Sequence, residues 1–287
     1  MATCYRHPSR ETGVSCSNCG RPICPDCMTT TPVGMRCPEC AGERTKVKTI
    51  RSVSSRPELT LALIAINVVA FLAEGNVSIG GRPTNNVYAE GALFGSIEGV
   101  PGLGVAHGQW WRIVSGGFLH ENLLHIAFNM YVLYVLGSML EPALGRMRFG
   151  LIYAVSLLAG SLGALIVSPH SLTVGASGAV FGVMGAAAVE MRARQIPVMQ
   201  SGVGGLILIN LVISFALPGI SWGGHVGGLI GGALAAIALQ LGARFRQQAA
   251  ALGACLVLGA ACFAGCVAIS KSTEAEAGTP VRLIEPG

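Results

Sequence analysis

Four polar side chains interrupt otherwise apolar stretches of the sequence: Ser177, His225, His125 and Asn129. A serine hydroxyl is a poor nucleophile until a base takes its proton, and neutral imidazole is the usual base. We therefore expect Ser177 to be the nucleophile and His225 its general base. His125 and Asn129 are four residues apart, so they share one face of a helix, and each can donate a hydrogen bond to a developing oxyanion. The predicted chemistry is acyl transfer.

The carboxylate that usually orients the histidine of such a site has no candidate in this chain. Asp26 is the only aspartate, it lies among the N-terminal cysteines, and the glutamates of the apolar part stand at the ends of apolar runs. A serine–histidine dyad is therefore expected in place of a triad. The same inventory argues against an aspartyl protease, which needs two aspartates, and against a zinc protease with a His-Glu-x-x-His helix. No metal is expected for catalysis.

Glycines surround both reactive residues. Gly175 and Gly178 flank the serine. Around the histidine, glycines recur at every fourth position, at Gly224, Gly228 and Gly232. Glycines four apart line one face of a helix and let two backbones approach closely. We expect the glycine face around His225 to pack on Gly178 and Gly182, close enough for the serine and the histidine to form a hydrogen bond.

Most of the chain is too apolar for an ordinary soluble domain. Of its 287 residues, 52% are hydrophobic and only 11% are charged. Seven apolar runs have about the length that a helix needs to cross a bilayer. They cover residues 58–74, 120–140, 147–168, 173–190, 201–218, 221–240 and 249–270.

Basic residues mark alternate breaks between these runs and so predict an orientation. They lie at residues 44–56, Arg146, Arg148, Arg192, Arg194, Arg244 and Arg246, whereas breaks 168–172 and 218–221 carry no charge. The positive-inside rule then places the N-terminus in the cytoplasm and the four polar residues in the outer half of the membrane. The net charge of +5 comes mainly from residues beside spans, so nucleic-acid binding is not expected. Residues 75–119 form a long external connection without clear helical periodicity.

Cysteines and one histidine form four closely spaced pairs near the N-terminus: Cys4 with His7, Cys16 with Cys19, Cys24 with Cys27, and Cys37 with Cys40. A two-residue gap lets both side chains of a pair face one ion, and eight such ligands suit about two structural Zn²⁺ ions. Disulfides are the alternative, but they require an oxidising compartment and this segment is expected in the cytosol. Either alternate or neighbouring pairs could close a site. The four-residue segment 20–23 and a resemblance to cross-braced B-box or RING-like fingers favour alternate pairs.

The motifs of the apolar part resemble those of the rhomboid family of intramembrane serine proteases, in the family's order, over about residues 56–245. They are Trp111-Arg112, the run His-Glu-Asn-Leu-Leu-His-Ile-Ala-Phe-Asn at 120–129, Gly175-Ala176-Ser177-Gly178 and Gly224-His225-Val226-Gly227-Gly228. The resemblance implies Ser177 as nucleophile and His225 as base. It also implies an oxyanion hole of His125, Asn129 and the Ser177 amide, and a membrane-embedded external loop after the first span.

The predicted fold is an all-α polytopic membrane protein with a six-helix rhomboid core and a seventh C-terminal helix, behind a small zinc-binding module. The expected parts are residues 1–42 (zinc module), 43–57 (basic linker), 58–245 (protease core), 246–270 (additional helix) and 271–287 (external tail). The expected activity is hydrolysis of peptide bonds in or near transmembrane segments of membrane proteins. The protein is expected in the bilayer of the cell membrane. A cytosolic protein is a possible partner of the zinc module. The alternative is a catalytically silent adaptor that binds transmembrane segments, which would have no use for an intact Ser177 and His225.

Overall fold

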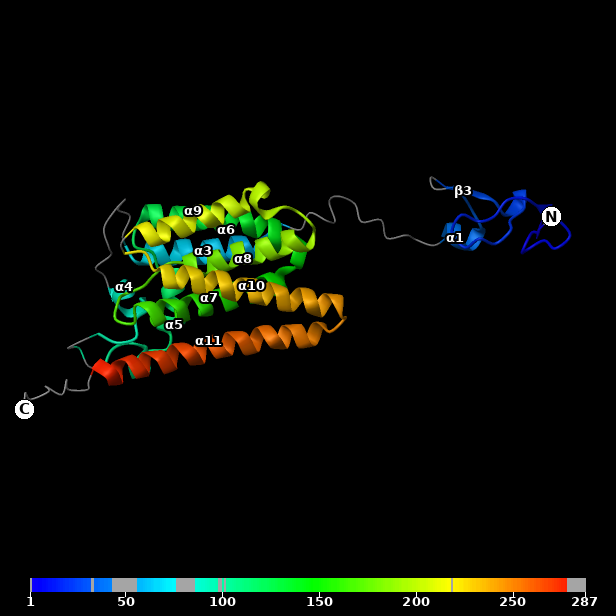
Figure 1. Cartoon of the computed structure of the whole chain (residues 1–287). Coiled ribbons are helices and arrows are strands. Elements are labelled where there is room, and N and C mark those ends of the chain that lie inside the picture. Colours follow the sequence, from blue (N-terminus) through cyan, green and yellow to red (C-terminus); the bar gives the residue numbers. More distant parts are fainter. Residues whose placement is uncertain are drawn as a thin grey trace, which may run out of the picture. The chain divides into compact units, whose positions relative to one another are not determined.

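The computed structural model describes residues 2–31, 34–42, 56–75, 86–97, 100, 102–217 and 219–277. The chain divides into two compact units, Met1–Ser54 and Ser55–Gly287, and each is considered by itself (Figure 1). Most of the predicted linker 43–57 and the last ten residues of the predicted tail 271–287 lie outside the described residues.

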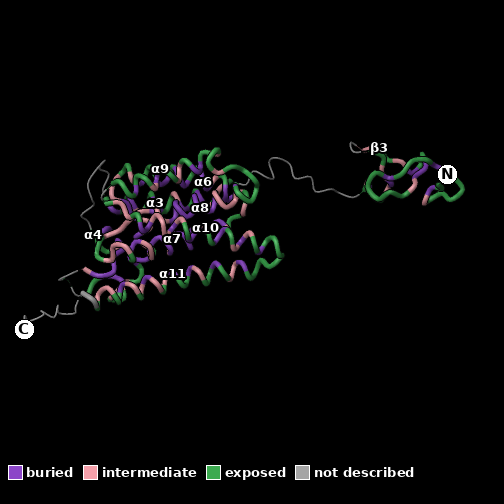
Figure 2. The backbone as a smooth tube through the Cα atoms, viewed as in Figure 1, coloured by how far each residue is buried: buried purple, intermediate pink, exposed green. Residues whose placement is uncertain are grey.

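The N-terminal unit is built from very short elements around its cysteines. Strand β1 (Ala2–Thr3) pairs with β2 (Glu11–Thr12), and β3 (Thr29–Thr31) pairs with β4 (Gly34–Arg36), both antiparallel. The helical turns are η1 (Pro25–Cys27) and α1 (Pro38–Gly42). Six of the seven cysteines are buried, together with Ile23 (Figure 2). So small an apolar core contributes little to folding, and a domain of this kind ordinarily depends on bound metal for its stability.

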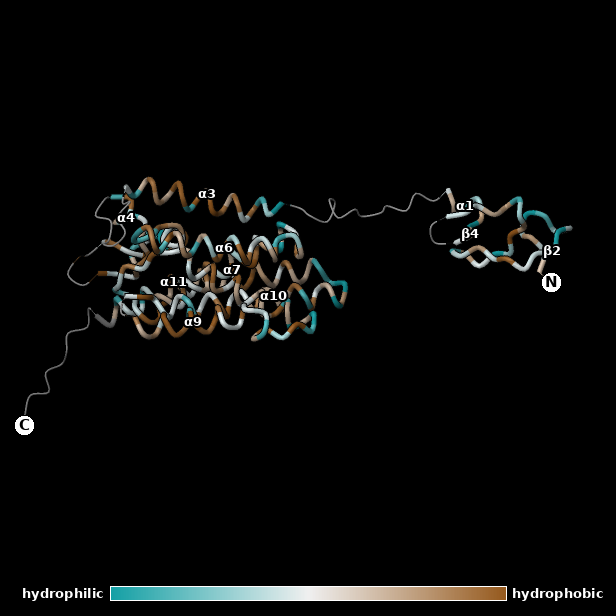
Figure 3. Tube along the Cα trace, turned by 90° about the horizontal axis from the view of Figure 1, so that it is seen from above, coloured by the Kyte–Doolittle hydropathy of each residue, from teal (hydrophilic) through white to brown (hydrophobic). Residues whose placement is uncertain are grey.

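In the residues that the structure describes, the second unit is a bundle of seven long helices, and its predicted all-helical membrane fold is confirmed. The helices are α3 (Glu58–Ala73), α6 (Leu123–Leu144), α7 (Arg146–Val167), α8 (Ser177–Ala193), α9 (Val203–Ala216), α10 (Trp222–Arg244) and α11 (Gln248–Ala277). Four of them are long and apolar enough to cross a membrane, namely α6, α7, α10 and α11, and α3 and α9 are shorter apolar helices. Figure 3 shows apolar residues along α3 and α9. The protein is a multi-pass membrane protein.

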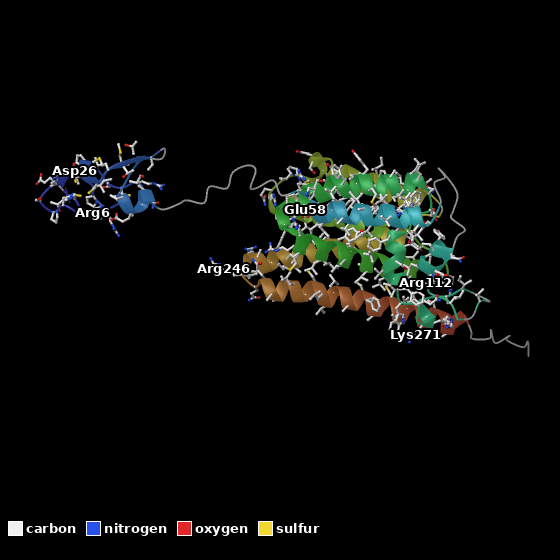
Figure 4. The ribbon with its side chains drawn as sticks, turned by 180° about the vertical axis from the view of Figure 1, so that it is seen from behind. Arg6, Asp26, Glu58, Arg112, Arg246 and Lys271 are labelled. Carbon is white, nitrogen blue, oxygen red and sulfur yellow. The ribbon has the colours of Figure 1, made fainter. Side chains whose placement is uncertain are left out.

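Charged residues lie toward the ends of the bundle. Figure 4 shows Glu58 and Arg246 at one end and Arg112 and Lys271 at the opposite end. This separation agrees with the high cost of placing a charge in hydrocarbon. One buried carboxylate, Glu141 in the last turn of α6, accepts hydrogen bonds from the Thr60 backbone N–H and hydroxyl, both at 2.7 Å.

Two helices begin three or four residues later than their apolar runs. The α6 helix starts at Leu123 because Asn122 caps it, with its side chain accepting a hydrogen bond from the His125 N–H at 2.9 Å. The α8 helix starts at Ser177 and not at residue 173, because Thr173 is bonded to another segment of the chain. The reactive serine is therefore the first residue of its helix.

The connection 75–119, whose sequence shows no clear helical periodicity, contains short helices in its described part. It contains α4 (Asn86–Gly91), η2 (Val105–His107), α5 (Arg112–Ser115) and η3 (Gly116–Phe118). These helices span three to six residues, too few for an apolar period to repeat, so hydrophobic periodicity could not reveal them.

Glycine contacts bring α8 and α10 together as the sequence predicts. A Cβ atom on Gly228 would overlap the Gly178 carbonyl, and one on Gly232 would overlap that of Gly182. Gly224 instead lies beside Ser221 and the Gly160 carbonyl of α7. The α7, α8 and α10 helices therefore meet backbone to backbone at the level of the site.

Candidate active site

The candidate serine and histidine, Ser177 and His225, come from different helices and form a hydrogen bond. The Nε2 atom of His225, in the first turn of α10, lies 2.8 Å from the Oγ atom of Ser177. Both side chains are half-buried. The Ser177 hydroxyl is thus in place to give its proton to a neutral imidazole.

The backbone just before Ser177 has a conformation that favours glycine. Gly175 has φ +126°, and a Cβ atom there would lie 2.8 Å from the Nε2 atom of His125. The N–H of Gly175 donates to the carbonyl of Gly116 at 2.9 Å. This turn therefore places the His125 ring against the segment that carries Ser177.

The connection between α3 and α6 supports this segment. Leu93 and Thr173 exchange two backbone hydrogen bonds of 2.9 and 2.8 Å. The buried Arg112 donates to the carbonyls of Ala89 and Ala92, at 2.8 Å each, and so holds the chain that leads to Leu93. The Trp111–Arg112 pair of the sequence thus acts through the backbone around Leu93 and not by touching Ser177.

Two neighbours of His225 were not predicted from the sequence. The Oγ atom of Ser214, in the last turn of α9, lies 2.5 Å from His225 Nδ1. The ring of Phe181, one turn after Ser177 on α8, stacks on the imidazole with centroids 4.2 Å apart and planes 13° apart. The four-residue spacing of Ser177 and Phe181 was the available signal for the second contact, because it places both on one face of α8. Nothing local in the sequence links Ser214 to a histidine on another helix.

The expected oxyanion residues occupy consecutive turns of α6. His125 lies beside Gly175, whose position also borders the Ser177 hydroxyl. Asn129 is buried, and within the described part of the chain its Nδ2 atom has no hydrogen-bond partner. The N–H of Ser177 belongs to the first turn of α8, where amides have no acceptor within the helix. No hydrogen bond joins Asn129 Nδ2 to Ser177 in the described structure.

His120 has a structural position near the site. It is fully buried, its N–H donates to the Glu74 carboxylate, and its Nε2 lies 3.5 Å from the N–H of Ala176. Asn122, and not His120, caps α6.

A small cavity of about 30 Å³ lies next to the pair. Its lining includes Ser177, His225, Ser161, Ser221 and Thr173. This volume is enough for a water molecule, which needs about 10–15 Å³ and several polar partners. The site therefore has room for a water molecule.

The N-terminal ligands form two four-residue clusters, and they combine alternate pairs. One cluster contains Cys4, His7, Cys24 and Cys27, the other contains Cys16, Cys19, Cys37 and Cys40, and in each the ligand atoms lie within 4.8 Å of one another. The Nδ1 atom of His7 faces the Sγ atoms of Cys24 and Cys27 at 3.3 and 3.4 Å. Three thiols with an imidazole, and four thiols, are donor sets that fit Zn²⁺. Both clusters are compatible with zinc binding.

Two thiols of these clusters have pKa values shifted in opposite directions. Hydrogen bonds from the backbone amides of Cys19 and Cys37 lower the pKa of Cys16 to about 6, whereas burial raises the pKa of Cys27 to about 11. A divalent cation would compensate the charge of such closely spaced thiolates.

Comparison with known proteins gives the family of the chain. The family model described as "Rhomboid domain" matches residues 107–241. The chain is 35% identical to the "Putative rhomboid protease YdcA" of Bacillus subtilis (strain 168) over 136 residues, which are 46% of this chain and 68% of that protein. The chain belongs to the rhomboid family. The matched residues include all four side chains of the candidate rhomboid site and leave out the cysteine clusters, α3 and α11.

Other rhomboid relatives are similar over longer segments. The "Rhomboid protease GluP" of the same Bacillus strain is 34% identical over 202 residues, 69% of this chain but only 38% of that protein. The "Rhomboid-like protease 1" of Toxoplasma gondii is 32% identical over 179 residues, 55% of this chain and 59% of that protein. The chain thus spans well under half the length of GluP.

Proposed function

We propose that this protein is an intramembrane serine endopeptidase that hydrolyses peptide bonds in or near transmembrane segments of membrane proteins. The observation that carries the proposal is the 2.8 Å contact between Ser177 Oγ and His225 Nε2 across two helices. Membership of the rhomboid family, with relatives named as proteases, supports it.

The proposed reaction uses only groups of this chain, the substrate and water. Ser177 Oγ attacks the scissile carbonyl carbon while its proton passes to His225 Nε2. The negative charge on the substrate oxygen is stabilised by the side chains of His125 and Asn129 and by the N–H of Ser177. His225 then protonates the leaving amine as the C–N bond breaks, which leaves an ester on Ser177. Water, deprotonated by His225, attacks the ester carbon, and His225 returns the proton to Ser177 Oγ as the C–O bond breaks.

The free donor of Asn129 supports its role in this scheme. Its buried Nδ2 has no acceptor in the described structure, and an unsatisfied buried donor has a cost unless a ligand provides the acceptor. Asn129→Ala should therefore lower kcat by about a hundredfold, within the range for loss of one oxyanion donor, with little change in KM.

The proposed orientation follows from the basic residues. Arg146 and Arg148 begin α7, Arg192 lies near the end of α8, and Arg244 ends α10, whereas Ser177 and His225 lie at the opposite ends of α8 and α10. By the positive-inside rule the arginine ends face the cytoplasm. The site then opens toward the external side of the cell membrane.

Cleavage of a single-span reporter protein in liposomes tests the proposed activity. The full chain should cut the reporter in or near its span, and Ser177→Ala and His225→Ala should each abolish cutting. If folded parent protein bound the reporter without cutting it, the chain would be an adaptor and not a protease.

We propose also that the two N-terminal clusters hold structural zinc, about two ions per chain. Elemental analysis should find this amount in the full chain, about one ion in Cys19→Ser, and almost none after deletion of residues 1–42. Cys255→Ser, which changes a thiol of α11, is the control and should keep both ions. Zinc retained by the truncated chain would contradict the assignment. Binding of a cytosolic protein to this module stays a prediction.

A further inference from the structure

The hydroxyl of Ser214 contacts both the catalytic base and its own helix. Its Oγ atom lies 2.5 Å from His225 Nδ1 and 2.6 Å from the carbonyl oxygen of Asn210. A carbonyl oxygen only accepts, so the single hydroxyl proton of Ser214 is directed to Asn210. The lone pairs of Ser214 Oγ then face Nδ1, which must be the donor.

This hydrogen-bond direction fixes the protonation of the imidazole. A neutral histidine carries one ring proton, so a proton on Nδ1 leaves Nε2 as the acceptor. Nε2 is the atom that faces Ser177 at 2.8 Å. The four groups form one chain, from the Ser177 hydroxyl through both nitrogens of His225 and the Ser214 hydroxyl to the carbonyl of Asn210.

We infer that Ser214 is a positioning residue that holds His225 in the Nδ1–H tautomer and so prepares Nε2 to receive the Ser177 proton. Ser214 takes the place of the carboxylate that serves this role in a triad, but as a neutral hydroxyl. The inference rests on the proposed protease function. The stack of Phe181 holds the face of the imidazole ring, and Ser214 adds control over which nitrogen carries the proton.

The position of Ser214 also connects the base to α9. The buried residues of this helix are Val203, Gly204, Asn210 and Ser214, and most of its large side chains are exposed. The buried residues in its C-terminal half are therefore Ser214 and Asn210, whose carbonyl accepts the Ser214 hydrogen bond. A shift of α9 away from α10 would remove the acceptor from Nδ1, so the position of α9 with Ser214 against His225 is the one that supports catalysis.

Ring-¹⁵N-histidine NMR of the full chain in bilayers tests the tautomer without any need for activity. The His225 signals, assigned by their absence in His225→Gln, should show a protonated Nδ1 and an unprotonated Nε2 at neutral pH. In Ser214→Ala the Nδ1–H preference should be lost, and Ser214→Thr, which keeps a hydroxyl, should restore it. A parent protein with the proton on Nε2 would overturn the inference.

Kinetics with the single-span reporter provide the second measurement. Ser214→Ala should lower kcat by about tenfold or more with KM nearly unchanged, since only proton transfer is affected. Ser270→Ala is the matched control, because Ser270 is also buried and bonds the carbonyl four residues earlier, that of Cys266 at 2.8 Å, on α11. Equal kcat values for Ser214→Ala and Ser270→Ala would refute the role. A parent that cuts nothing but shows the Nδ1–H signals would refute the protease and leave the hydrogen-bond assignment standing.

Discussion

The position of Ser177, the proposed nucleophile, depends on the backbone of Gly175. Gly175 combines φ +126° with close contact to the His125 ring, and the left-handed conformation costs other residues about 1–3 kcal/mol. Its backbone is also tied to Gly116. Glycine is therefore needed here for two reasons, conformation and space.

Gly175→Ala should reduce the rate of Ser177 labelling by an active-site probe by at least about tenfold, because the turn or His125 must move. Gly253→Ala is the control, since nothing lies within 4 Å of a Cβ atom at that position of α11. Equal labelling rates in the two variants would show that the turn does not determine the position of the serine.

At the scale of elements, the contact between α8 and α10 brings the reactive pair together. Gly228 has no room for a Cβ atom, because the Gly178 carbonyl occupies that space. Both Ser177 and His225 lie within one turn of this contact along their helices. Any separation of the two backbones therefore lengthens the distance between Oγ and Nε2.

Gly228→Val should lower the free energy of unfolding by about 1–3 kcal/mol, the usual cost of overpacking, and remove most Ser177 labelling. Leu234→Val, at an exposed position of the same helix, should change neither property. Thermal unfolding in detergent and probe labelling check the two effects. Full labelling of Gly228→Val would contradict the proposed role of this contact.

The seventh helix, α11, contacts the connection that supports the site. His107 of η2 and Glu274 of α11 form an ion pair of 2.5 Å, and Ser270 lies against Gly95. Both partners of the pair are partly exposed, so its contribution to global stability should be only about 0.2–1 kcal/mol. Its effect is expected to be local.

Glu274→Gln should speed amide hydrogen exchange in residues 92–97 and 102–112 with little change in the unfolding temperature. Exchange in α8 should stay as in the parent. Unchanged exchange throughout the connection would show that α11 does not stabilise it through this ion pair.

At the scale of the whole molecule, the catalytic groups and the cysteine clusters belong to different units. Ser177, His225, His125, Asn129 and Ser214 all lie in the unit Ser55–Gly287. Deletion of residues 1–55 should therefore leave Ser177 labelling within about twofold of the full chain when each is folded in detergent. A complete loss of labelling would show that the zinc module takes part in the chemistry.

The sequence predicted the helices better than the contacts between them. Apolar runs revealed all seven long helices, because membrane length and composition are local properties. The start of α6 was placed three residues too early and the start of α8 four residues too early. Asn122 caps α6, and Thr173 is hydrogen-bonded to Leu93 and so stays outside α8. Ser214 escaped prediction because its partner lies on another helix. The contact between Ser177 and His225 could be predicted because polar residue types are rare in apolar helices.

Labelling with a fluorophosphonate probe tests the central claim most directly. The folded full chain should gain one adduct on Ser177, found by mass spectrometry of the modified peptide, whereas Ser177→Ala should gain none and His225→Ala almost none. An unlabelled parent, or a His225→Ala variant that is labelled as fast as the parent, would contradict the account.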